Sequence, residues 1–485
     1  MPLDPGAFLG RWEVALPGLL VAAAAMLVML VDALGRRVEQ RGLAALGILG
    51  LGAAAAAALW LWAAGGTAAG FEDTLRADRY ALFFALLVCA GAGLTLLMSV
   101  EYVEEQGIAG GEYYALLLLS AAGMVFMAAA NDLIVIFLAL EIMSVGVYVL
   151  AGILRGDARG NEAAVKYFLL GAFASAFLLY GIAFFYGATG STRLDTIAQA
   201  VGHGGLTPMM LVGTALLLVG FGFKVALIPF HVWTPDVYEG APTAITAFMA
   251  VGVKAAGFAA FARVFVAALG GAAASWTGLL WVAAALTMTV GNVTAVSQTS
   301  VKRMLAYSSI AHAGYALVGL VAAPAGGSAL LFYLVAYAAM NAGAFAVLIA
   351  LGRRGEPHEA LADLAGLGFR HPLLGLAMTV FMLSLAGIPP TAGFVGKFYL
   401  FSAAVDAGYV GLVVIGVLNS LVSVYYYAGV VVQMYMAEGA RPVIPLGERP
   451  ALAAAIATAA VVTVLLGVFP AGAMEVARAA FASLR

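Results

Sequence analysis

Residues 223–242 read FKVALIPFHVWTPDVYEGAP, and residues 384–399 read SLAGIPPTAGFVGKFY. Each stretch lies in an apolar run that is too long for one straight membrane helix. Proline removes a backbone donor and clashes with the preceding turn, so we predict breaks at Pro229 and at Pro389-Pro390. Broken helices at membrane depth persist only where they face protein or a wet cavity. Both breaks should therefore lie in the interior of a helical bundle.

The composition is that of a membrane protein. The 485 residues are 64% hydrophobic and 10% charged, and the mean hydropathy is +1.04. We expect an all-α polytopic protein, a single membrane domain over 1–485, with about fourteen transmembrane helices of about 20 residues. The first run is long enough to remain a membrane span rather than a cleaved signal. The apolar runs are about 14–33, 42–64, 79–100, 113–130, 132–154, 163–187, 208–238, 242–267, 274–297, 303–323, 328–352, 372–406, 409–436 and 451–470.

The chain contains an internal repeat. YVLAG at 148–152 matches YALVG at 315–319, 167 residues later, and LIP at 227–229 matches GIP at 387–389, 160 residues later. These matches align helix five with helix ten and helix seven with helix twelve. Repeats five helices apart have opposite membrane orientations, which is the inverted-repeat plan of many transporters. The predicted segments are 113–267 for helices 4–8, 274–436 for helices 9–13, and 451–485 for a C-terminal helix.

Lysine and arginine are distributed differently along the chain. Lys166, Lys224, Lys254 and Lys397 lie inside apolar runs, whereas Lys302 lies in a polar connection and nearly all arginines lie in loops or at segment ends. Arginine keeps its proton in proteins, but a desolvated lysine readily loses it. The pattern therefore indicates a membrane protein that handles protons.

One carboxylate and three lysines lie deep in the predicted helices. Glu141, Lys224 and Lys254 are near mid-helix, and Lys397 follows the second break by about two turns. A charge in the hydrocarbon core costs at least about 2.5–3.5 kcal/mol, and such residues usually mark an ion path. A static ion pair could account for one lysine, but not for three lysines against one carboxylate. We therefore interpret these four residues as proton-transferring groups, in wet surroundings or with lysines that rest neutral.

Five further polar residues have less specific roles. His312, one turn after Ser308, could relay protons near neutral pH or be a satisfied core histidine. Lys166 lies about one turn inside its helix and could join the path or extend to the interface. His231 and Asp236 follow the first break, where we expect them to shape the inner mouth more than to transfer protons.

The sequence predicts no cofactor or metal in this chain. A single cysteine, Cys89, excludes an internal disulfide and any all-cysteine metal or iron–sulfur site. No phosphate-cradling loop, nucleotide fingerprint or nucleophile constellation is present, so redox chemistry is not expected here. The net charge of −2 argues against nucleic-acid binding.

Arg263 is expected to be a rim residue that extends to the interface, and Tyr425–Tyr427 are expected to pack and to anchor the interface.

Basic loop residues predict the orientation of the chain. If the N-terminus is outside, the inside loops carry twice as many basic residues as the outside loops and tails, so we expect both termini in the periplasm. The inside set is Arg36, Arg37, Arg41, Arg155, Arg159, Lys302, Arg303, Arg353, Arg354, Arg370, Arg441 and Arg449, and the outside set is Arg11, Arg76, Arg79, Arg193, Arg478 and Arg485.

The two proline-containing stretches and VKRMLAYSSIAHAGY at 301–315 resemble the antiporter-like subunits of respiratory complex I. WTPDVYEGAP is typical of N-type subunits of the bacterial proton-translocating NADH:quinone oxidoreductase, rather than of their L- and M-type relatives. In that family the helix-five glutamate pairs with the helix-seven lysine, and lysines of helices eight and twelve continue an axis of charge. By motif these are Glu141, Lys224, Lys254 and Lys397. The resemblance implies proton translocation without a redox centre in this chain, driven by electron transfer elsewhere in the complex.

The resemblance also implies partners and a location. Flavin and iron–sulfur clusters are expected in partner subunits, and the neighbours would be other membrane subunits, especially the M-type subunit and the lateral helix of the L-type subunit. Lipid of the bacterial inner membrane would surround the rest. Alternatives are a subunit of a multisubunit cation/proton antiporter, a pumping subunit of a membrane-bound hydrogenase, or a structural membrane scaffold. A sodium route would predict further membrane carboxylates, and apart from Glu141 none lies near mid-depth.

Overall fold

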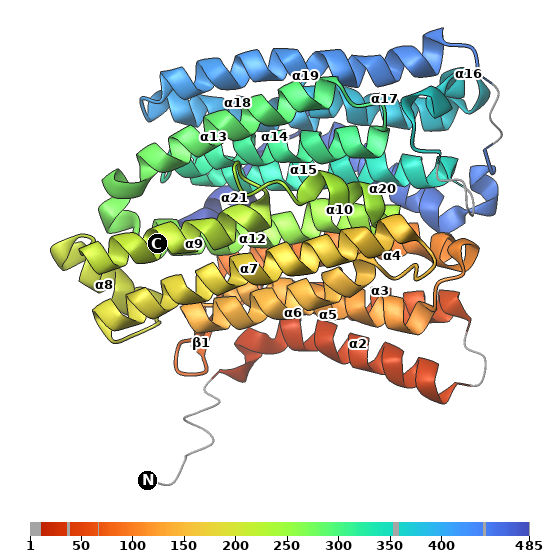
Figure 1. Cartoon of the computed structure of the whole chain (residues 1–485). Coiled ribbons are helices and arrows are strands. Elements are labelled where there is room, and N and C mark those ends of the chain that lie inside the picture. The colour runs from red at the N-terminus through yellow and green to blue at the C-terminus, as the bar shows by residue number, and fades with distance from the viewer. Residues whose placement is uncertain (1–10, 36–38, 66, 353–357, 440–442, 485) are drawn as a thin grey trace.

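The computed structural model describes residues 11–35, 39–65, 67–352, 358–439 and 443–484, and this part of the chain is almost entirely helical (Figure 1). Within it, 13 helices are long and apolar enough to cross a membrane. The pair α17–α18 adds an interrupted span, which matches the expected architecture. The elements are η1 Trp12–Ala15, α2 Leu16–Leu34, α3 Gln40–Ala63, α4 Arg79–Gln106, α5 Gly110–Ala129, α6 Leu133–Ala151, α7 Ala158–Thr189, α9 Pro208–Val225, α10 Thr234–Gly240, α13 Ala273–Val296, α14 Val301–Val321, α15 Gly327–Leu351, α16 Leu367–Arg370, α17 Pro372–Ala386, α18 Ala392–Asp406, α19 Val410–Met436 and α20 Pro450–Val468.

Both predicted helix breaks are present, but the prediction that they lie in the interior is wrong for the prolines, because Pro229, Pro389 and Pro390 are exposed on this chain. The turn around Pro229 separates α9 from α10, and the turn around Pro389 and Pro390 separates α17 from α18. Each upstream helix ends in a left-handed residue, Ala226 with φ 62° and Gly387 with φ 87°. A left-handed residue directs the chain out of the helix and lets later N–H groups satisfy the last carbonyls. The prolines that follow then prevent the helix from resuming immediately.

The two breaks have the same hydrogen-bond pattern. The backbone N–H of Leu227 donates to the carbonyl of Gly222 at 2.8 Å, and that of Ile388 donates to the carbonyl of Leu383 at 3.0 Å. These bonds are related by 161 residues, one more than the short sequence matches predicted. In this register Leu385 of the second repeat takes the position of Lys224.

The helix pairs α5–α6 and α13–α14 cross in the same way. Gly123 and Gly146 lie at the first crossing, and Gly291 and Gly314, each 168 residues later, lie at the second. A Cβ atom on Gly314 would lie 2.7 Å from the backbone nitrogen of Met288, so only glycine allows this approach. Small residues at helix crossings are typical of membrane bundles, where close backbone packing stabilises association. The equivalent crossings agree with the two five-helix repeats.

One span is surrounded by the rest of the bundle and is completely buried. It runs through α11, Thr243–Phe248, the π-helical segment η2, Met249–Val253, α12, Lys254–Ala262, and a second π-helical segment η3, Arg263–Ala268. A π-helical turn widens the backbone and is often found at functional sites. Lys254 follows the first of these segments directly.

A hairpin and a short helix close the bundle at one end (Figure 1). Arg76 of the hairpin donates to Asp73 at 2.7 Å and to Asp195 of the short helix at 2.6 Å. The Arg76 guanidinium beside Asp73 lowers the pKa of that carboxyl. The elements are β1 Thr67–Gly70 and β2 Leu75–Asp78, which pair antiparallel, α8 Leu194–Gly204, and η4 Gly270–Ala272.

Two basic residues lie deeper than the sequence predicted. Arg263, expected at the rim, is 2% exposed and donates two hydrogen bonds to Asp78, at 2.7 and 2.8 Å. Lys302, expected in a polar connection, begins α14 and forms a buried ion pair with Glu359 at 2.8 Å. Burial of these charges is tolerated because a carboxylate supplies oxygens at close range. Both carboxylates are distant in sequence, so no local pattern reveals the pairs.

The C-terminal segment forms two helices rather than the single helix expected over 451–485. Pro470 ends the continuation of α20, and α21, Ala471–Ala482, folds back against α4 and α15. The ring of Phe481 lies where a Cβ atom on Gly327 would be.

Some of the arginines that predict the orientation lie outside the described residues. These are Arg36, Arg37, Arg353, Arg354, Arg441 and Arg485.

Candidate functional site

Lys224 lies at the end of α9, before the first break, and is 3% exposed. Its ammonium group donates to Ser144 Oγ at 2.7 Å and to the Tyr148 hydroxyl at 3.2 Å, both on α6. The ring of Tyr148 also lies 5.3 Å from the ammonium nitrogen, which favours a cation. Hydroxyl groups can accept and donate, so this site has partners for the lysine in either protonation state.

Glu141 forms no ion pair with Lys224 in this structure. Its carboxylate is half-buried and accepts a hydrogen bond from Ser175 of α7 at 2.5 Å. Ser144, which contacts Lys224, follows Glu141 by three residues on α6. The Lys224 ammonium group, which comes from α9, therefore lies against α6 one turn from Glu141, and each of the two charges has a serine as its partner. The direct contact implied by the resemblance is not formed in this conformation.

Lys254, in the buried central span, is also 3% exposed. Its ammonium group donates to both the hydroxyl and the carbonyl oxygen of Ser309, the hydroxyl at 2.5 Å. Tyr337 of α15 donates to the same hydroxyl at 2.8 Å, and its ring lies 5.5 Å from the lysine nitrogen. Three helices thus converge on one ammonium group, and no carboxylate of the described residues pairs with it.

His312 lies one turn beyond Ser309 on α14 and is 1% exposed. Its Nε2 atom contacts the Tyr427 hydroxyl at 3.1 Å, and its Nδ1 atom contacts the Tyr333 hydroxyl at 2.7 Å. Tyr427 in turn contacts Ser308 Oγ at 2.5 Å. Because each hydroxyl can donate or accept, the ring can carry its proton on either nitrogen. Ser308 and His312, predicted as possible relay residues, are therefore brought together through Tyr427.

Lys397 lies beyond the second break but reaches back across it. Its ammonium group donates to the carbonyls of Leu385 and Ala386, at 3.0 and 3.1 Å, and to Ser420 Oγ at 2.7 Å. The two carbonyls are free because the break removes their helical donors. The ring of Tyr315 lies 4.6 Å from the nitrogen. Tyr315 matches Tyr148 in the short sequence repeat, and the ring of each of these tyrosines lies beside a buried lysine.

The run Tyr425–Tyr427 was predicted to pack and to anchor the interface; Tyr426 and Tyr427 are packed in the core, but they also form hydrogen bonds that this prediction did not include. Tyr427 binds His312 and Ser308, and Tyr426 donates to Asn292 at 2.8 Å. Tyr425 is 71% exposed, as an interface residue would be. Three adjacent residues of a helix face different directions, so one composition-based interpretation could not hold for all of them.

Lys166 and Asp236 lie apart from the buried lysines. Lys166 is partly exposed and pairs with Glu162 at 2.6 Å and with Asp236 at 2.7 Å. Arg303 binds Asp236 from the other side at 3.0 Å. His231 is half-buried in the turn between α9 and α10. Lys166 lies about two turns inside α7 rather than the one turn expected, and these contacts give it an ion-pairing role that joins α7 to the first turns of α10 and α14.

The partners of the lysines were missed from sequence. Ser144, Tyr148, Ser309, Tyr337 and Ser420 supply most of the hydrogen-bond acceptors and rings described above. Serine and tyrosine are common in membrane helices and do not stand out as lysine does. The one available signal was the repeat match itself, because both of its tyrosines face a lysine.

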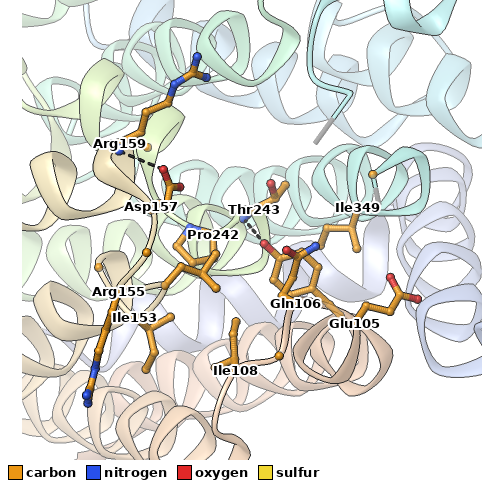
Figure 2. A pocket seen from close by; sticks show the side chains of 18 of the residues that line it. Glu105, Gln106, Ile108, Ile153, Arg155, Asp157, Arg159, Pro242, Thr243 and Ile349 are labelled. Atoms are coloured by element: carbon orange, nitrogen blue, oxygen red, sulfur yellow. Dashed lines mark hydrogen bonds between the residues drawn. The ribbon is translucent and has the colours of Figure 1, made fainter. Parts of the chain in front are cut away.

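A cleft of about 1130 Å³ opens at the end of the bundle opposite the hairpin. Figure 2 shows Glu105 and Gln106, at the end of α4, on one side and Arg155 and Asp157, from the α6–α7 connection, on the other. Thr243, the first residue of the buried central span, lies between them. The buried pair Lys302–Glu359 also lines this cleft.

Comparisons with known proteins agree with these features. The family model described as NADH:quinone oxidoreductase/Mrp antiporter, TM, matches residues 130–423. A relative, NADH-quinone oxidoreductase subunit N of Trichlorobacter lovleyi, is 49% identical over 471 residues, which is 96% of each chain. The chain belongs to the subunit N family of NADH-quinone oxidoreductases.

Solved structures show the same fold in a chain of respiratory complex I and in a chain of an Mrp complex. A chain of respiratory complex I from Thermus thermophilus is 39% identical, with a TM-score of 0.80, over 95% of this chain and 98% of that chain. A chain of the Mrp complex from a Dietzia species has a TM-score of 0.85 but is 25% identical, over 98% of each chain. The complex I chain and the Mrp chain both share the backbone fold of this protein. The higher identity to subunit N therefore decides between the complex I and antiporter interpretations.

Proposed function

We propose that this subunit moves protons through the membrane part of an NADH:quinone oxidoreductase. The proposed proton-carrying groups are Glu141, Lys224, Lys254 and Lys397, with His312 as a relay. One observation supports this above the others. The three lysines are at most 4% exposed, and none of them has a carboxylate partner among the described residues.

A structural role does not account for such lysines. A lysine that only stabilises a fold is normally neutralised by a carboxylate, as Lys302 is by Glu359. Lys224, Lys254 and Lys397 instead contact hydroxyls, carbonyls and ring faces, which can serve either protonation state of the amine. A lysine in this setting can accept and release a proton, which arginine cannot do.

In the proposed path the clusters follow one another across the bundle. Lys224 has its hydroxyl partners on α6, beside Glu141, and Lys254 has its partner at Ser309. Ser308, the residue next to Ser309, leads through Tyr427 to His312. Lys397, which donates to Ser420, is the next group after His312 in the proposed series. The proposed transfer runs along this series when Lys224 exchanges its hydroxyl partners for the carboxylate of Glu141.

The driving force and the partners belong to the same proposal. Electron transfer by flavin and iron–sulfur clusters in partner subunits would supply the energy. The neighbours would be other membrane subunits of the complex, especially the M-type subunit and the lateral helix of the L-type subunit. The location would be the bacterial inner membrane, with both termini in the periplasm.

The test is Lys254→Met in the assembled complex, reconstituted in liposomes and supplied with NADH and a quinone. We expect a lower proton-to-electron ratio or a several-fold slower turnover, with normal assembly. Thr463→Val is the matched control, because Thr463 is buried on α20 and donates only to its own helix at Ala459. Normal pumping by Lys254→Met would contradict the proposal. Sodium-dependent pumping would favour the antiporter alternative.

A further inference from the structure

Asn341, in the middle of α15, is completely buried. Neither its amide nitrogen nor its amide oxygen has a hydrogen-bond partner among the residues that the structure describes. An asparagine amide offers two donors and one acceptor oxygen, and leaving them unpaired inside a protein is strongly unfavourable. Because the side chain is sealed from the surface, neither lipid nor a neighbouring subunit can reach it.

Asn341 continues a stripe of polar side chains on α15. Tyr333 contacts His312 at 2.7 Å, and Tyr337, four residues later, donates to Ser309 at 2.8 Å. Asn341 follows after another four residues. Residues four apart lie on the same helix face, one turn from each other. Asn341 therefore lies next to the cluster that holds Lys254, on the side away from Tyr333.

The same direction along α15 leads to the cleft. Leu348, Ile349 and Gly352 line the cleft, and Leu348 lies seven residues beyond Asn341, or about 10 Å at 1.5 Å per residue. The central span, which starts at Thr243 in the cleft, and α14 both pack against α15. About three water molecules, spaced at about 2.8 Å, would cover this distance.

We propose that Asn341 binds an internal water molecule that completes a proton-uptake route from the cleft to Lys254. Buried waters typically make about three hydrogen bonds to polar groups that would otherwise be unsatisfied, and this amide is such a group. Along the route the water passes a proton to Tyr337, and Ser309 passes one to Lys254. Each hydroxyl accepts one proton as it donates another, so no charge remains behind. Asn341 is a positioning residue, because it holds the water and does not titrate.

The direction of uptake rests on the proposed function, whereas the water site rests on the buried amide alone. The first test is therefore a high-resolution map of the whole complex, in which density for water is expected within hydrogen-bond distance of the Asn341 amide. A resolved amide without such density would overturn the proposal.

The second test compares two substitutions. Asn341→Leu keeps the shape of the side chain and removes its polar atoms, so we expect a several-fold slower proton translocation with normal assembly. Asn341→Ser leaves a hydroxyl and space for water, so it should retain most of the activity. Ser120→Ala is the control: Ser120 is also buried and without a partner in the described part of the chain, but lies on α5 against Gly146. It should have no effect.

The outcomes separate the two proposals. If Asn341→Leu pumps normally while Lys254→Met does not, the uptake route is wrong and the function stands. If both pump normally, the proposed function is wrong. An Asn341→Leu complex that is fully active and unfolds at a higher temperature would show that the amide had been dry and merely unsatisfied. If Asn341→Leu fails to assemble, the map and the Asn341→Ser variant decide.

Discussion

The hydrogen-bond acceptors around each buried lysine determine whether that lysine can release its proton. Lys224 and Lys254 donate to serine or tyrosine hydroxyls, and Lys397 donates to the carbonyls at a helix break and to Ser420. A carboxylate partner would hold the proton on the lysine by favouring the charged form. Uncharged oxygens bind the ammonium group without that bias, and hydroxyls can also donate to the free amine. A proton can then pass between neighbouring groups with only a small change in free energy.

Lys397→Arg tests whether this lysine titrates. Arginine keeps a positive charge and can still donate to Ala386 and Ser420, but it does not release its proton at physiological pH. We expect normal assembly with a several-fold loss of proton translocation by the reconstituted complex. Lys397→Ala is a poorer test because it also empties the space beside Tyr315. A normal proton-to-electron ratio for Lys397→Arg would mean that a fixed charge suffices.

For single residues, the sequence predicted the buried lysines better than it predicted the hydrogen-bond partners of those lysines. Lysine inside an apolar run is rare and costly, so each of the four stood out. Serine and tyrosine carry no such cost, and only the packing of α6, α14, α15 and α19 determines which of them face a lysine. Asn341 was missed for the same reason. Its significance lies in its lack of a partner, which no sequence pattern shows.

The elements are arranged by close helix crossings and by the two breaks. The prolines predicted the breaks correctly, but the sequence matches placed the second repeat one residue out of register. Short matches such as LIP and GIP tolerate this error, whereas the hydrogen bonds at Leu227 and Ile388 define the register unambiguously. The hairpin and α21 were not predicted because each is too short or too polar to resemble a membrane span.

Gly314→Ala tests the crossing of α13 and α14. The added Cβ atom would lie 2.7 Å from the backbone nitrogen of Met288, and a backbone atom cannot move aside alone. Overpacking of this kind typically costs about 1–3 kcal/mol, so we expect a lower unfolding temperature or less assembled complex. Gly278→Ala on α13 is the control, because no heavy atom lies within 4 Å of its Cβ position. Equal behaviour of the two variants would rule out close packing at Gly314.

The pair Arg263–Asp78 tests how the central span is joined to α4. Arg263→Met leaves the buried carboxylate of Asp78 without its partner, which typically costs about 3–5 kcal/mol. We expect this variant to unfold at a clearly lower temperature. The double variant with Asp78→Asn should be more stable than Arg263→Met alone, because no charge is then left unpaired. Additive losses from the two substitutions would contradict coupling between them.

The two ends of the whole molecule differ in accessibility. At one end the hairpin and α8 are joined by ion pairs through Arg76, whereas the other end opens as a cleft above the buried central span. The number of spans could be predicted because apolar length is a strong signal. The cleft could not, since it is formed by residues from five separate connections and helix ends. Its position determines which end of the proposed route would take up protons.

The membrane orientation can be predicted from basic residues that are exposed at the cleft end. Arg155 and Arg159 are exposed beside the cleft, and lysine and arginine near span ends favour the cytoplasmic side. We therefore expect the cleft to face the cytoplasm and α8 to face the periplasm. In a Cys89→Ala background, His203→Cys at the end of α8 should react with a membrane-impermeant maleimide on intact cells. Arg155→Cys should react only after the cells are permeabilised, and both should react then. Labelling of Arg155→Cys but not of His203→Cys on intact cells would reverse the orientation, and protons would then enter the cleft from the periplasm.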